Sequence, residues 1–92
     1  MQGGGTDSEP ITPELAFGKA VAALRHEQGY SQESLAFASG LHRTYISMLE
    51  RGLRSPKLGT IFRLAAVFTI SPGELVSRAE AELKATHGTG EG

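Results

Sequence analysis

Residues 32–51 read QESLAFASGLHRTYISMLER, and this stretch predicts two short helices joined by a tight turn. Leu35 and Ala36 lie midway along the first helical segment, and Gly40 falls at the expected turn. Two helices that cross at a steep angle must approach each other closely, and a small residue such as Ala36 permits this. The turn needs a residue that tolerates positive φ, which glycine adopts without a steric penalty. The spacing is therefore typical of a helix-turn-helix.

A helical wheel divides the second of these helices into two faces. The apolar face holds Tyr45, Ile46 and Leu49. The opposite face is mostly polar and holds Arg43, Thr44, Ser47, Met48 and Arg51. Arginine and hydroxyl side chains on one helix face suit contacts with base edges and phosphates in a DNA major groove. Any short surface helix can show a polar outer face, but the turn glycine and the basic residues that follow favour a DNA-reading helix.

The basic residues are concentrated in the middle of the chain, although the formal net charge is −1. Between positions 42 and 63 there are five arginines and lysines, and Glu50 is the only acidic residue. Between positions 74 and 92 there are two basic residues and four glutamates. Attraction to phosphates depends on the charge of the local face rather than on the sum over the chain. The polarised charge is therefore compatible with a nucleic-acid partner.

Length and composition predict one small domain in the cytoplasm. The chain has 92 residues, which is within the usual size of a single domain. It has no cysteine, so neither a disulfide framework nor a thiolate metal site is expected, and a reducing cytosol fits. No apolar run approaches the roughly 20 residues of a membrane span. The start, MQGGGTDSEP, does not have the pattern of a signal peptide, and no membrane partner is expected.

Three further helices are predicted around the motif, so the expected fold class is all-α. Thr12-Pro13-Glu14 is a helix start, with a hydroxyl cap, proline at the first helical position and a carboxylate in the first turn. This first helix is expected to end near Gly29, and Ser31 is expected to cap the next. The apolar positions of the first helix and of a fourth helix are Phe17, Val21, Leu24, Leu58, Ile61, Leu64, Ala65 and Phe68.

A capping box, Ser71-Pro72-Gly73-Glu74, predicts a fifth helix that carries Leu75, Val76, Ala79 and Leu83. The ends of the chain are polar and rich in glycine, a composition that cannot bury a core. We therefore expect a disordered arm at residues 1–11, a folded DNA-binding domain at 12–84 and a flexible tail at 85–92.

With these features in this order, the chain resembles the Cro/phage-repressor type of helix-turn-helix protein, also called the XRE family. The resemblance rests on Leu24-Arg25, YSQESLA at 30–36, SGLHRTYISMLERG at 39–52, RSP at 54–56 and ISPGEL at 70–75. It implies a compact, five-helix, lambda-repressor-like domain that binds operator DNA, usually as a symmetric dimer, and regulates transcription. The stretch HRTYIS is similar to the controller proteins of restriction–modification operons.

The resemblance also implies roles for individual residues. The side chains that it implies for reading bases are Arg43, Thr44, Ser47 and Met48. Those that it implies for binding phosphates are Gln32, His42, Tyr45, Arg51, Arg54 and Lys57. Arg25 and Glu50 are implied to form a structural pair. His42 stands where the family usually has a small polar helix cap, so the third helix is expected to start less firmly. Lys57 likewise replaces the usual small polar cap before the fourth helix.

Other functions find less support in the sequence. His26, His42 and His87 share no metal-ligand spacing, no Ser/His/Asp arrangement is visible, and no glycine-rich phosphate loop occurs. We therefore expect no metal, no cofactor and no enzymatic activity. Apolar residues of the last two helices are expected to form a homodimer interface, and these are Phe62, Ala66, Val67, Val76, Ala79 and Leu83. The alternative is an antitoxin or anti-repressor whose main target is another protein and which uses this apolar surface to bind it.

Overall fold

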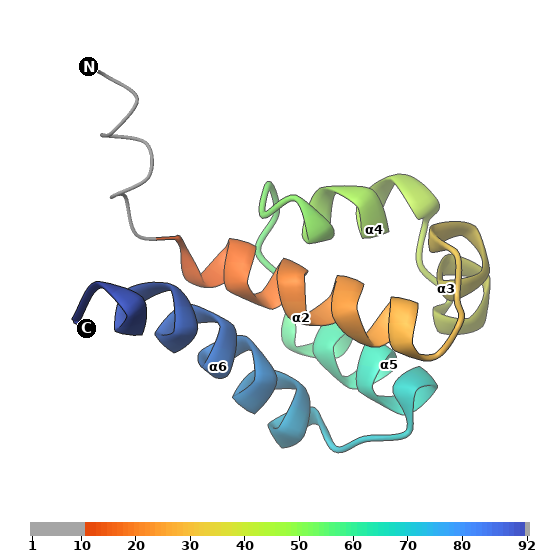
Figure 1. Ribbon diagram of the computed structural model, residues 1–92. Coiled ribbons are helices and arrows are strands. Elements are labelled where there is room, and N and C mark those ends of the chain that lie inside the picture. Colours follow the sequence, from red (N-terminus) through yellow and green to blue (C-terminus); the bar gives the residue numbers. More distant parts are fainter. Residues whose placement is uncertain (1–10, 92) are drawn as a thin grey trace.

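The computed structural model describes residues 11–91, with side chains described for residues 11–85. Five helices follow in the order α2 (Pro13–Glu27), α3 (Gln32–Ser39), α4 (Arg43–Glu50), α5 (Leu58–Phe68) and α6 (Pro72–Glu91). Helix α2 runs through the middle of the molecule, with α4 on one side of it and α5 and α6 on the other (Figure 1). Within the described range there is no strand, and the predicted five-helix, all-α fold is confirmed.

Helix starts follow the predicted capping residues. The hydroxyls of Thr12, Ser31 and Ser71 each accept a hydrogen bond from the backbone N–H three residues further on, at 2.9–3.0 Å. Such a bond satisfies one of the unpaired donors in the first turn of a helix. His42 and Lys57 make no side-chain capping bond to α4 or α5, as we expected for these departures from the family pattern.

The core is formed by apolar side chains from all five helices. Its buried members are Phe17, Val21, Leu24, Leu35, Ala36, Ile46, Leu49, Leu64, Ala65, Phe68 and Leu75. One predicted apolar position was wrong, because Leu58 is 70% exposed at the first residue of α5. Thr60 instead lies inward on this helix, only 7% exposed, on the same stripe as Leu64 and Phe68. The spacing of four residues places these three side chains on one helix face.

Helix α2 packs closely on the carboxyl end of α4 through two glycines. A Cβ atom on Gly18 would meet the backbone carbonyl oxygens of Leu49 and Glu50, lying 2.7 Å from the latter. A Cβ on Gly52, whose φ is +75°, would lie 2.8 Å from the Cα atom of Leu15. Real Cβ atoms do not approach backbone atoms this closely, so the absence of a side chain at both positions sets the distance between α2 and α4.

Helix α6 continues to Glu91, beyond position 84 at which we expected the domain to end. Alanines at positions 79, 81 and 85 favour the helical conformation, and Lys84 pairs with Glu80 one turn earlier at 3.6 Å. The expected flexible tail at 85–92 therefore begins as helix. The expected arm lies almost entirely outside the described residues, and the division into arm, domain and tail stays a prediction.

Among the described residues, no single helix combines the length and the apolar composition that crossing a membrane requires. Helix α5 and the part of α6 up to Ala85 reach that length and composition only when they are taken together, and the two helices meet at a bend of 99°.

Candidate nucleic-acid interface

The turn between α3 and α4 has the geometry that its glycine predicts. Gly40 has a φ of +75°, in the left-handed region, and directly follows α3. The N–H of Leu41 donates to the carbonyl of Ala36 at 3.0 Å, and the N–H of Gly40 donates to that of Phe37 at 3.4 Å. These two bonds form a Schellman motif, which ends a helix and satisfies its last carbonyls. The chain therefore reverses at Gly40 and begins α4 three residues later, at Arg43.

Helix α4 presents the two faces that the sequence predicted. Ile46 and Leu49 are fully buried, and Tyr45 is half-buried beside them. On the opposite side Arg43 and Thr44 are exposed, and Ser47 and Met48 are half-buried. All four side chains implied for reading bases therefore lie outside the core on one helix. Their contacts with DNA stay a prediction.

Basic side chains border this face beyond the end of α4. Arg51 is exposed, and its Nε donates to the carbonyl of Ser47 at 3.4 Å. The guanidinium carbon of Arg54 lies 5.9 Å from the centre of the Tyr45 ring, and its NH1 lies 3.8 Å from the sulfur of Met48. Lys57 is exposed. The exposed side of α4 therefore has a cationic margin, which suits a phosphate backbone.

Arg63 belongs to the same basic segment, but its guanidinium contacts the protein backbone. Its NH1 donates to the backbone carbonyl of Ser39 at 3.3 Å, at the carboxyl end of α3. A cation at this end of a helix interacts favourably with the last carbonyls. Arg63 thus ties α5 to the turn of the helix-turn-helix instead of joining the margin formed by Arg51, Arg54 and Lys57.

Tyr45 is held by a residue that the sequence analysis missed. Its hydroxyl lies 3.2 Å from Oγ1 of Thr60, which is buried on α5. The signal available in the sequence was a threonine at the position four residues before Leu64, on the inward face of α5. Its spacing alone does not predict this contact, because the hydroxyl of Thr60 matters only through a tyrosine on another helix.

Arg25 and Glu50 form the implied pair, and the pair reaches Gln32. The Nε of Arg25 donates to one carboxylate oxygen of Glu50 at 2.6 Å, and its NH2 donates to the other at 3.0 Å. Nε2 of Gln32 donates to the second of these oxygens at 2.9 Å. One N–H of the Gln32 amide is therefore directed inward, at the first position of α3. The implied contact of Gln32 with phosphate stays a prediction and would use its other N–H.

The charges divide between opposite sides of α2. Glu50 is the only acidic residue between positions 42 and 63, and its carboxylate is compensated by Arg25. Glu74, Glu80 and Glu82 lie on α6, which Figure 1 shows on the far side of α2 from α4. Phosphates that approach α4 therefore meet the cationic side chains of Arg51, Arg54 and Lys57, and the carboxylate within that segment is already compensated.

The described residues hold no group of three or more histidine, cysteine or acidic side chains placed to bind a metal ion. His26 and His42 are exposed, and the side chain of His87 lies outside the described part of the chain. The side chains around α4 accordingly offer hydrogen-bond donors and positive charge, which are the groups that bind a polyanion.

Comparison with known proteins agrees with this geometry. A sequence profile of the helix-turn-helix family matches residues 21–75, which include α3, the turn, α4 and α5. The chain belongs to the helix-turn-helix family of XRE-type transcriptional regulators. Over 63 residues this helix-turn-helix regulator is 41% identical to the control protein C.BamHI of Bacillus amyloliquefaciens, covering 67% of the chain and 78% of that relative.

Solved structures of similar proteins share the fold of this regulator. The restriction–modification controller protein C.AhdI from Aeromonas hydrophila is 46% identical, with a TM-score of 0.65 over 66% of this chain and 92% of that one. A complex of SinR protein with SinI protein gives 32% identity and a TM-score of 0.62, over 64% of this chain and 58% of that one. The likeness to C.AhdI and C.BamHI agrees with the resemblance of HRTYIS to controller proteins.

Proposed function

We propose that this regulator binds a palindromic operator as a homodimer, with α4 of each copy in the major groove, and acts in the cytoplasm. The observation that carries the proposal is the outward face of α4, where Arg43, Thr44, Ser47 and Met48 lie beside the cationic margin. A recognition helix reads bases with side chains near its amino end while neighbouring cations hold the backbone. Arg43 is the first residue of α4 and is exposed, so its guanidinium can reach a guanine as a bidentate donor.

The proposed phosphate contacts come from α3, from α4 with its N-cap, and from the segment after α4. Gln32 would contribute an amide N–H, Tyr45 a hydroxyl and His42 a ring N–H. Positive charges would come from Arg51, Arg54 and Lys57. Phosphate contacts fix the register of a protein on the duplex but carry no sequence information directly. We therefore assign specificity to the outward face of α4 and affinity to the surrounding groups.

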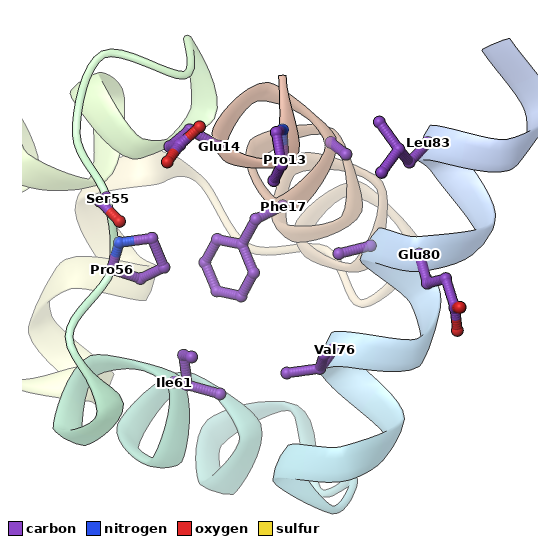
Figure 2. A pocket seen from close by; sticks show the side chains of 11 residues that line it. Pro13, Glu14, Phe17, Ser55, Pro56, Ile61, Val76, Glu80 and Leu83 are labelled. Atoms are coloured by element: carbon purple, nitrogen blue, oxygen red, sulfur yellow. The ribbon is translucent and has the colours of Figure 1, made fainter. Parts of the chain in front are cut away.

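Apolar side chains on α5 and α6 support the homodimer. Phe62 is 54% exposed and Val76 is 48% exposed, so a partner that covered them would remove apolar surface from water. Val76, Ala79 and Leu83 line a pocket of about 520 Å³ between α2, α5 and α6. Figure 2 shows Phe17, Ile61, Val76 and Leu83 pointing into this pocket. Ala66 and Val67 line a second hollow of about 460 Å³ beside Arg63. We propose that a second copy covers part of this surface.

Two-fold symmetry of the protein explains why a palindromic operator is expected. One recognition helix reads a few base pairs, and two copies related by a two-fold axis read the same sequence on both strands. A single module buries too little surface to bind DNA tightly alone. Pairing two modules therefore raises the affinity for DNA in which two half-sites have the correct spacing.

The second candidate function is binding of a protein partner, as in an antitoxin or anti-repressor. The exposed apolar side chains on α5 and α6 are the observation that favours it, because a partner could cover them as well as a second copy could. The two functions use different surfaces, since DNA would meet α4 and a protein would meet α5 and α6. Substitutions on one surface therefore separate them.

The experiment is a selection of binding duplexes from a random pool with the purified chain, followed by footprinting on the enriched sequence. We expect a palindromic sequence protected over two half-sites one helical turn of DNA apart or a multiple of it. Binding should be lost on a scrambled duplex of the same composition. Absence of any enriched sequence with a folded protein would contradict the DNA-binding proposal and favour the protein partner.

A further inference from the structure

Three contacts connect the buried face of α5 with the cationic margin of the recognition helix. The hydroxyls of Thr60 and Tyr45 lie 3.2 Å apart, the guanidinium of Arg54 lies over the Tyr45 ring, and Arg54 also touches the sulfur of Met48. Arg54 belongs to the segment between α4 and α5, where no helix holds its backbone. The position of its guanidinium therefore depends on the ring beneath it.

We propose that Thr60 is a positioning residue for DNA binding, which holds the Tyr45 ring in place and so sets where the Arg54 guanidinium meets the phosphate backbone. This inference rests on the proposed function and adds to it a buried residue that touches no DNA. A long arginine side chain loses much conformational freedom when it is fixed on a ligand. An arginine whose guanidinium already rests on an aromatic face loses less conformational freedom when it binds phosphate.

The chemistry of the hydroxyl pair gives a direction to this bond. Phosphate oxygens only accept hydrogen bonds, so the Tyr45 hydroxyl has to donate its proton if it contacts a phosphate. Its oxygen then accepts from Thr60, whose hydroxyl must be the donor. Thr60 is 7% exposed, so water competes little for this bond. The threonine thus leaves the O–H of Tyr45 free for DNA while it fixes the tilt of the ring.

The test compares two substitutions of Thr60 in the full chain. Thr60→Val keeps the shape of the side chain but removes the donor, and we expect it to weaken binding to the selected operator about threefold to tenfold. Thr60→Ser keeps the hydroxyl and should bind within about twofold of the wild type. In an Arg54→Ala background, Thr60→Val should cause a clearly smaller loss, because the guanidinium that it positions is already absent and only the contact of the Tyr45 hydroxyl can still change. The same loss in both backgrounds, or wild-type binding by Thr60→Val, would overturn the proposal.

Ser39→Ala is the control for losing a buried hydroxyl elsewhere in the domain. Its hydroxyl donates to the carbonyl of Leu35 at 2.7 Å on α3, away from Arg54. We expect this variant to lower stability toward urea while it leaves the salt dependence of DNA binding unchanged. Thr60→Val should reduce the salt dependence, because Arg54 then meets the backbone less often.

A measurement without DNA separates this inference from the proposed function. In the free protein, nuclear Overhauser contacts between Arg54 and the Tyr45 ring should be present in the wild type and in Thr60→Ser and be lost in Thr60→Val. If Thr60→Val does not fold, Tyr45→Phe removes the other partner of the bond and should give the same loss. Unchanged contacts in the folded variant would overturn the positioning role even if the protein binds its operator. Absence of operator binding by the wild type would instead refute the proposed function.

Discussion

The guanidinium of Arg25 on α2 and the carboxylate of Glu50 at the end of α4 face each other through two hydrogen bonds, of 2.6 and 3.0 Å. Their side chains are only 12% and 7% exposed. Arg25 also donates to the backbone carbonyl of Tyr30 at 3.1 Å, just before α3. This pair therefore joins α2 to both helices of the helix-turn-helix, and each charge depends on the other for compensation.

Removing Arg25 should destabilise the fold strongly. In Arg25→Ala the nearly buried carboxylate of Glu50 keeps, among the described residues, only the amide of Gln32 as a partner. We expect a loss of about 1–4 kcal/mol in the free energy of unfolding. Urea melts followed by circular dichroism measure it. Arg78→Ala is the control, since this arginine forms exposed pairs with Glu27 and Glu74 and should change stability by less than about 0.5 kcal/mol. Equal melts for both variants would contradict a structural role for the pair.

Two glycine-to-alanine substitutions should have opposite effects on stability. Gly18→Ala places a methyl group against the carbonyls at the end of α4, so we expect a loss of about 1–3 kcal/mol. Gly59→Ala lies on α5 with open space around it, and alanine should stabilise that helix by about 0.4–1 kcal/mol. Thermal melts of the two variants test this directly. A stable Gly18→Ala protein would mean that α2 and α4 can separate without cost.

Arg43 and Lys57 should contribute differently to DNA binding. Arg43→Ala removes a guanidinium that we propose to read base edges, and it should cost about 1–3 kcal/mol on the operator but much less on scrambled DNA. Lys57→Ala removes a charge that we propose to contact only the DNA backbone. Both duplexes should therefore weaken about equally, and the slope of log affinity against log salt should flatten by about 1. Titrations of both duplexes at several salt concentrations measure this. Equal losses on the two duplexes for Arg43→Ala would remove Arg43 from the base-reading set.

The oligomeric state should respond to a charge on α5 but not to one on α3. We expect light scattering at micromolar concentrations to give about twice the 9.7 kDa mass of the chain. Phe62→Glu should shift the mass toward the monomer, because the charge would be buried in the proposed interface. Phe37→Glu is the control, since Phe37 is 90% exposed on α3 and outside that surface. A wild type that is monomeric both free and on DNA would rule out the homodimer.

Much of the fold could be read from local patterns in the chain. Caps such as Thr12, Ser31 and Ser71, and the turn glycine Gly40, act within a few residues of themselves, so the sequence is enough to predict them. The apolar spacing of Phe17, Val21 and Leu24 likewise predicts a buried face, because helical geometry alone sets which side chains share it. The outward face of α4 follows from the same geometry, whereas the base-reading roles of its side chains were implied by the family resemblance and stay a prediction.

Other features depend on contacts between helices, and only the tertiary structure decided them. Helical spacing placed Leu58 in the apolar stripe, but its position at the start of α5 leaves it exposed, and Thr60 takes the inward position. The role of Thr60 depends on Tyr45 fifteen residues away, and that of Gly18 on carbonyls more than thirty residues away. No local pattern encodes such distances. The sequence by itself determined which helices form and which face of α4 points outward, whereas the packing of α2, α4 and α5 decided which side chains hold the recognition helix and its cationic margin in place.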